Sequence, residues 1–154
     1  MIFLHLFVIL ILVILQVTFF SHLAIYSFAP PILFLTVLSY LLVGRRYEAF
    51  LYGAVGGLLL DFFSPHFRFG TETLAILLVL LLWQVVVRFL GSLRLGLIIM
   101  VYFLSGLLYY FLLMVLSGDF VWQIIIGPLY LLALSPIFYL FFQKFLTPKE
   151  KIQV

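Results

Sequence analysis

The sequence predicts an all-α, polytopic integral membrane protein with about six transmembrane helices. Of its 154 residues, 68% are hydrophobic and 8% are charged, whereas soluble domains average about 25% charged residues. The apolar residues form about six runs separated by short connections, and a spanning helix needs about 20 residues. These runs are apolar on all sides, whereas the strands of a membrane barrel alternate apolar and polar residues. The length leaves no room for a separate catalytic domain.

The runs predict helices at 2–20, 31–43, 48–63, 72–90, 95–116 and 121–142. The first run lacks a basic n-region and a clear cleavage site, so we expect it to be retained. The second run, from Pro31 to Val43, spans only about 20 Å as a helix. It either begins near Leu23 and kinks at Pro30-Pro31, or is re-entrant; the kinked span is favoured because neighbouring helices can satisfy backbone groups freed by proline.

The last run is predicted to be interrupted at Gly127-Pro128 and at Ser135-Pro136. The domain organisation is therefore a transmembrane bundle over 1–143 and a short basic cytoplasmic tail over 144–154. Proline breaks of this kind can mark substrate paths in transporters, or can simply kink a helix around its neighbours. The sequence does not decide between these two readings.

The basic residues are distributed asymmetrically along the predicted topology. With six spans, seven of the eight lie on the side of the two termini, and only Arg68 lies on the other. Basic residues are retained on the cytoplasmic side, so the protein is expected in the cytoplasmic (inner) membrane with both termini cytoplasmic. Topology determinants that also contact anionic lipid are Arg45, Arg46, Arg94, Lys144, Lys149 and Lys151. A cytoplasmic protein partner for the basic residues is the alternative.

Several function classes are disfavoured by composition. The net charge of +3 does not indicate nucleic-acid binding, because the basic residues sit at the ends of apolar runs. The absence of cysteine excludes disulfides, thiolate metal sites and cysteine nucleophiles. His5, His22 and His66 are scattered without a ligand spacing, so we expect no metal or cofactor. Catalytic motifs and paired spanning aspartates are missing, so we expect no enzyme.

The densest motif is the run from Gly53 to Asp61. Gly53, Gly57 and Asp61 are spaced by four residues and therefore share one helix face. Two glycines at this spacing let another backbone approach closely, and an ionisable residue in a span usually has a function. One interpretation is a partner-binding groove closed by Asp61; the other is internal packing, with Asp61 accepting hydrogen bonds from nearby backbone or from Arg68.

Other polar residues in the runs favour helix association. Gln16, Thr18 and Gln84 can form hydrogen bonds between helices that contribute roughly 1 kcal/mol each. We expect these side chains to join helices within the bundle.

The region from Ala29 to Gly70 resembles the family of rod shape-determining proteins MreD. The resemblance rests on a first helix ending in Leu15-Gln16-Val17-Thr18, a proline-led second helix, the basic loop Gly44 to Glu48 and the motif Gly53-x-x-Gly56-Gly57-Leu58-x-x-Asp61. A loop containing proline and glycine then ends near Gly70, and Gly57, Asp61 and Gly70 are the most specific positions. One departure is Pro31, where family members often carry an acidic residue.

The resemblance implies a fold similar to the substrate-binding component of energy-coupling factor transporters. It also implies a non-catalytic scaffold of the cell-elongation (rod) complex, which supports peptidoglycan synthesis and cell shape with the bitopic protein MreC. RodA and a class B penicillin-binding protein would lie nearby. Gly53, Gly57, Asp61 and Gly70 become the positions for partner binding or for holding the loop.

Two alternatives remain from the sequence. One is the substrate-binding membrane component of a vitamin-type transporter; such proteins often carry small alanines on the first helix, and here no alanine precedes Ala24. The other is an unrelated small membrane protein or lipid-handling factor.

Overall fold

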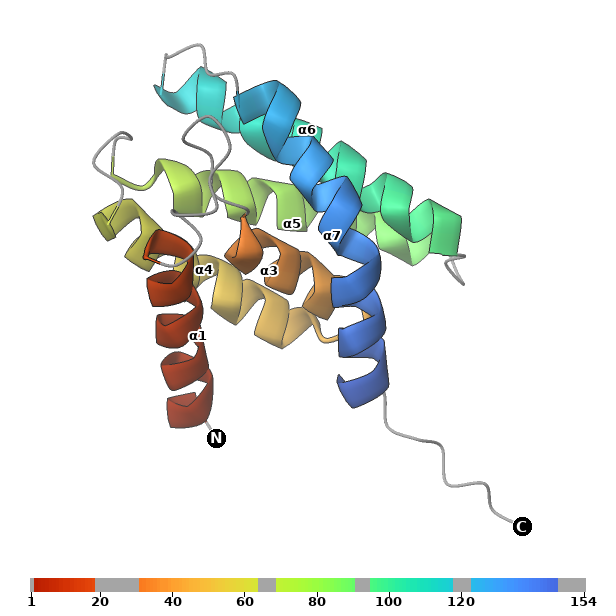
Figure 1. Ribbon diagram of the computed structural model, residues 1–154, viewed down its shortest axis with the longest axis horizontal. Helices are drawn as coiled ribbons and strands as arrows, with labels where there is room; N and C mark the ends of the chain where they lie inside the picture. The colour runs from red at the N-terminus through yellow and green to blue at the C-terminus, as the bar shows by residue number, and fades with distance from the viewer. Residues whose placement is uncertain (1, 19–30, 64–68, 91–94, 118–122, 147–154) are drawn as a thin grey trace.

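The computed structural model describes residues 2–18, 31–63, 69–90, 95–117 and 123–146, and every regular element in them is an α-helix. The helices are α1 (Ile2–Val17), α3 (Ile32–Leu42), α4 (Arg46–Phe63), α5 (Thr71–Leu90), α6 (Leu95–Ser117) and α7 (Gln123–Leu146). They form one bundle (Figure 1). The all-helical prediction is confirmed.

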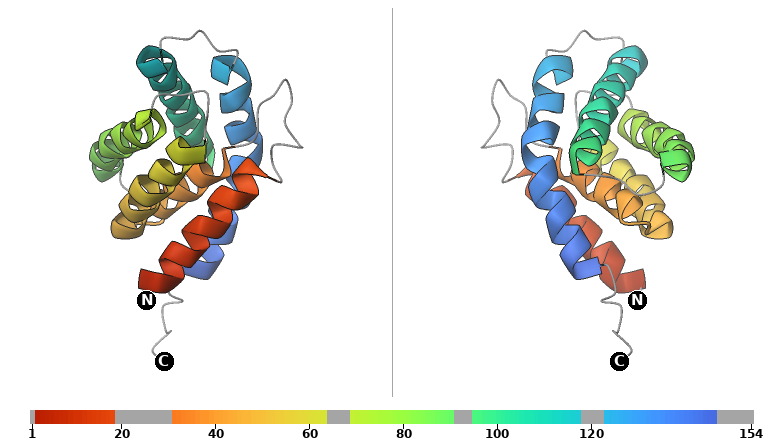
Figure 2. Two further views of the ribbon diagram at one scale, coloured as in Figure 1. Left: turned by 90° about the vertical axis from the view of Figure 1, so that its left-hand side faces the viewer. Right: turned by 90° about the vertical axis from the view of Figure 1, so that its right-hand side faces the viewer.

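Helix α3 is the centre of the bundle. All its residues from Ile32 to Leu41 are buried, and it contacts each of the other five helices. Figure 1 shows α3 between α1 and α7, and the side views in Figure 2 place it between α5 and α7. A helix that is apolar all round is expected in such a position.

The length of α3 bears on the second predicted span. Its 11 residues cover about 16 Å, which is shorter than a hydrocarbon core of about 30 Å. Leu23 and Pro30 lie outside the described residues, so the kinked and re-entrant alternatives both stay predictions.

Two of the helices are long and apolar enough to cross a membrane, judged by length and composition. They are Gly96–Leu116 in α6 and Ile126–Phe145 in α7. Shorter apolar stretches are Phe3–Val17, Ile32–Leu42 and Thr71–Val87. The number of six spans therefore stays a prediction.

The predicted interruptions in the last helix are wrong. Helix α7 is continuous and includes Pro128 and Pro136, although an interior proline removes one backbone hydrogen bond and crowds the preceding turn. Close packing on α6 accompanies this continuity: a Cβ atom added to Gly106 would lie 3.2 Å from Pro128 Cα, and the Tyr110 ring lies against Gly127. Tertiary contact thus overrides the local preference of proline.

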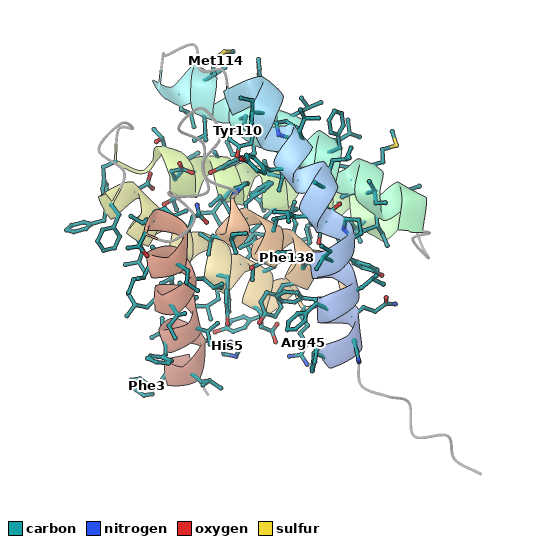
Figure 3. All side chains as sticks on the ribbon, in the orientation of Figure 1. Phe3, His5, Arg45, Tyr110, Met114 and Phe138 are labelled. Carbon is teal, nitrogen blue, oxygen red and sulfur yellow. The ribbon has the colours of Figure 1, made fainter. Side chains whose placement is uncertain are left out.

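The start of α1 and the end of α7 lie at the same end of the bundle (Figure 1). Arg45 lies there too, as does His5 (Figure 3). Lys144 is in the last turn of α7 and is exposed, like Arg45 and Arg46. We call the end that carries Arg45, Arg46 and Lys144 the basic end. Arg68, Arg94, Lys149 and Lys151 lie outside the described residues.

Candidate functional site

Asp61, in the last turn of α4, is bonded to the start of α5. Its carboxylate accepts hydrogen bonds from the backbone N–H of Glu72 at 2.8 Å, from the backbone N–H of Thr73 at 3.0 Å and from the Thr73 hydroxyl at 2.5 Å. The Asp61 side chain is buried, with 5% of its surface exposed. The first amides of a helix have no partner within the helix, and an acidic group placed there is stabilising. Asp61 therefore caps a helix other than its own.

Gly70 explains why that cap comes from a distant residue. Its carbonyl accepts the hydrogen bond from Leu74 N, which places Gly70 at the N-cap position of α5. Serine or aspartate at this position would supply an acceptor, but glycine has no side chain. The Gly70 φ is +94°, which L-residues rarely adopt. Asp61 supplies the acceptor that Gly70 lacks.

The glycines of α4 let α5 approach closely enough for this contact. A Cβ atom on Gly57 would lie 2.8 Å from Thr73 Cα, and one on Gly53 would lie 2.9 Å from Leu80 Cδ1. Gly56, one residue round the helix, is packed against Leu33 of α3 instead. The face shared by Gly53, Gly57 and Asp61 is therefore occupied by this chain's own α5. We call Gly53, Gly57, Asp61 and Gly70 together with the α5 start the α4–α5 cap.

A second acidic residue, Glu72, belongs to the same site. Glu72 is buried, and its carboxylate accepts a hydrogen bond from the Tyr109 hydroxyl of α6. The Tyr109 ring stacks on Phe34 of α3, with ring centroids 4.4 Å apart. Glu72 therefore links the α5 start to α6 and α3. In the sequence, Glu72 served only to mark the start of a predicted helix. Its role at the site could have been suspected, because it is an acidic residue that follows Gly70 closely in an otherwise apolar run.

Gln16 of α1 caps the start of α3 in a similar way, but with a single hydrogen bond. Its side-chain oxygen accepts a hydrogen bond at 2.9 Å from the backbone N–H of Leu33. Pro31, at the N-cap position of α3, makes no side-chain cap. Thr18, which was also expected to join helices, donates its hydroxyl to Ile14 O in its own helix at 2.6 Å.

The chemistry of the α4–α5 cap is that of a structural joint. Three donors from α5 surround one carboxylate, and the neighbouring carboxylate is bonded to a tyrosine. Among the described residues, no group of three or more histidine or acidic side chains could hold a metal ion. Arg68, one proposed partner of Asp61, lies outside the described residues.

Two further packing sites were missed from the sequence. Gly106 of α6 and Gly127 of α7 allow these two helices to approach each other. Each is a single glycine on its helix face, without the GxxxG spacing that marks a close helix contact in sequence. Ser39 of α3 and Tyr102 of α6, both buried, share a hydrogen bond of 2.6 Å. Neither pair has a signal in local sequence, because each joins helices far apart in the chain.

Comparisons with family models, with curated proteins and with solved structures found no match to this chain.

Proposed function

We propose that this chain is a non-catalytic membrane scaffold of the bacterial rod complex, of the MreD type. It would support peptidoglycan synthesis and cell shape together with an MreC-like bitopic protein, with RodA and a class B penicillin-binding protein as further partners. The observation that carries the proposal is the internal use of the only buried aspartate among the described residues: Asp61 is bonded to the first turn of α5. Such a residue joins two helices of the bundle, which supports a structural role for the motif.

The membrane placement rests on the helices and on the charges. Two long apolar helices are available for crossing, and α1 exposes large apolar side chains such as Phe3, Leu4 and Phe7. Lipid is the natural environment for such a surface. The basic end would face the cytoplasm, because basic residues are retained on that side.

The surface that we propose for a helix of the bitopic partner lies on α6. Leu104, Leu107, Leu108 and Phe111 are spaced i, i+3, i+4 and i+7 and line a shallow hollow of about 380 Å³. This spacing is the pattern by which one helix anchors in another surface. Leu104 and Phe111 are exposed over 40% and 51% of their surface, so part of each side chain is available for contact.

Co-expression with an MreC-like bitopic protein tests the proposal. Affinity purification of this chain in mild detergent is expected to retain the bitopic protein at a fixed ratio. The double variant Leu104→Ala with Phe111→Ala is expected to lower the retained fraction at least about tenfold, because two apolar anchors contribute roughly 1.4 kcal/mol or more in total.

The matched control removes the same kind of surface from α5. Leu81→Ala with Val85→Ala changes two exposed apolar residues and is expected to leave the retained fraction unchanged. If the unmodified chain fails to retain the bitopic protein, the scaffold proposal is wrong. If both double variants behave alike, the partner does not bind at α6.

A second candidate is the substrate-binding component of a vitamin-type transporter. The observation in its favour is an apolar groove of about 480 Å³ between α1 and α7, a volume within the range of about 300–1,000 Å³ for small-molecule sites. A vitamin found by mass spectrometry in the purified protein would support this candidate over the scaffold.

A further inference from the structure

The groove between α1 and α7 is a lateral opening in the bundle. Val8 and Leu12 of α1 form one wall, Ile137 and Phe141 of α7 form the other, and Thr36 and Tyr40 of α3 lie between them. Among the described residues, no Cα atom of α1 comes within 8 Å of one in α7. Figure 1 shows the two helices on either side of α3. A volume of about 480 Å³ is therefore open at the side of the protein.

The lining of the groove selects a hydrocarbon. Its side chains are mostly aliphatic or aromatic. The Thr36 hydroxyl donates to Ile32 O at 2.9 Å, and the Tyr52 hydroxyl shares a hydrogen bond of 3.2 Å with His5 Nδ1. Polar ligands need several well-placed hydrogen-bonding groups, and two of the few hydroxyls here already have partners.

One end of the groove meets the basic end. Phe145 lines the groove and follows Lys144 directly in the chain. Tyr40, also in the lining, accepts a hydrogen bond through its carbonyl from Arg45 N at 2.9 Å. Figure 3 shows Arg45 at the end of the bundle below Phe138, between the lower parts of α1 and α7. Arg45 is paired with Glu48 at 3.2 Å, an exposed ion pair of the kind that contributes little and that an anion can displace.

The volume of the groove, about 480 Å³, can be compared with that of a lipid chain. Taking a methylene as similar in size to a water molecule, at about 30 Å³, the groove holds roughly 16 such groups. This is the size of one acyl chain.

We propose that the groove binds an anionic diacyl phospholipid, with one acyl chain between α1 and α7 and the phosphate against Arg45 and Lys144. This inference goes beyond the scaffold proposal, because it concerns a different face and a different ligand. It predicts a specific lipid site in addition to the general attraction of basic residues to anionic membranes.

Native mass spectrometry of the full chain tests the site. The protein is delipidated in mild detergent and exposed to equal amounts of phosphatidylglycerol and phosphatidylcholine with identical acyl chains. One phosphatidylglycerol per protein is expected to be retained, with a preference of about fivefold for each basic residue involved. Arg45→Gln with Lys144→Gln is expected to abolish the preference, whereas Arg88→Gln is expected to preserve it, because none of the groove-lining residues that the structure describes comes from α5.

Groove-filling variants test the acyl-chain half of the proposal. Val8→Trp and Ile137→Trp fill the groove from opposite walls, and each is expected to lower lipid retention at least about fivefold by occupying the space of several methylenes. Leu10→Trp places the same ring on the exposed face of α1 and is expected to retain lipid like the unmodified protein. Loss of lipid in both groove-filling variants, with lipid retained in Leu10→Trp, would show that the groove is blocked and that an added tryptophan does not by itself unfold the protein.

Three results would overturn the lipid site. The first is equal retention of the two lipids by the unmodified protein. The second is lipid retention that neither tryptophan variant changes. The third is loss of the bitopic partner in Val8→Trp with lipid retention unchanged, which would assign the groove to a partner helix. The scaffold proposal has its own test at α6 and can fail or succeed independently.

Discussion

The starts of α3 and α5 are both capped by a side chain from an earlier helix, but in different ways. At α5, the Asp61 carboxylate accepts three hydrogen bonds. At α3, the Gln16 amide accepts one. Neither Gly70 nor Pro31, at the two N-cap positions, supplies a side-chain cap. The same structural need is therefore met once by a charged group and once by a neutral group.

The difference shows how side-chain length and helix spacing are matched. Aspartate is short, so α4 and α5 must lie close together, and Gly53 and Gly57 allow this. Glutamine is one methylene longer and needs no glycine on α1. A carboxylate also interacts with the positive end of the helix dipole. We therefore expect the α5 start to depend more strongly on its cap than the α3 start does.

The largest effect is expected for Asp61→Ala. It leaves two backbone amides and one hydroxyl without their acceptor, which costs about 3 kcal/mol in unfolding free energy. Thermal unfolding in mild detergent measures the loss, and hydrogen exchange should rise at the amides of Glu72 and Thr73. Asp61→Asn keeps one acceptor oxygen and is expected to lose about half as much. Equal stability of Asp61→Ala and the unmodified protein would show that the cap contributes nothing.

Gly57→Ala is expected to have the next largest effect. Its Cβ atom would lie 2.8 Å from Thr73 Cα, and because that neighbour is backbone, α5 must move away from α4. We expect a loss of about 2 kcal/mol. Gly96→Ala is the control, since no atom lies within 4 Å of the added Cβ. Unchanged exchange at Thr73 in Gly57→Ala would contradict the close approach as described.

A smaller effect is expected for Gly70→Ala. The site has open space but a positive φ of +94°, so the cost is backbone strain of about 1 kcal/mol. Gly44→Ala is matched, with a φ of +89° and equally open space. Both variants should lose similar stability in thermal unfolding, but only Gly70→Ala should speed exchange at the α5 start. The same exchange pattern in both would contradict a specific role for Gly70.

The smallest effect is expected for Gln16→Ala, with a loss of about 1 kcal/mol for the single hydrogen bond to Leu33. Faster exchange of the Leu33 amide is the direct measurement. Thr18→Ala, at the same end of α1, removes a hydroxyl that donates to Ile14 O of its own helix and is expected to leave the Leu33 amide unchanged. If Gln16→Ala lost as much unfolding free energy as Asp61→Ala, the α3 start would depend on its cap as strongly as the α5 start does, which would contradict the expected order.

The sequence predicted much of this fold, because hydrophobic runs and helix breakers are local signals. The predicted helix at 72–90 and the observed α5 at Thr71–Leu90 differ by one residue. The shared face of Gly53, Gly57 and Asp61 follows from helical periodicity alone. What occupies that face could not be predicted, since it depends on how α5 folds back after Gly70.

Long-range contacts account for the remaining failures. The bond from Tyr109 to Glu72 joins residues 37 positions apart, and no local pattern marks it. Pro128 and Pro136 resemble helix breaks in the local sequence, but α7 continues through them. The packing of α7 on α6 involves residues far apart in the chain, so a local stretch of sequence does not reveal it. A glycine on a helix face indicates that another segment packs closely there, but the sequence does not show which segment it is.

The central position of α3 has a consequence for biogenesis. Because α3 contacts all five other described helices, its surroundings are incomplete until α7 has been synthesised and has packed against it. A nascent chain halted before Gln123 would leave the α7 side of α3 uncovered. Such a truncated chain would expose apolar surface to the proteases that remove unassembled proteins, so the core is protected only once α7 is in place.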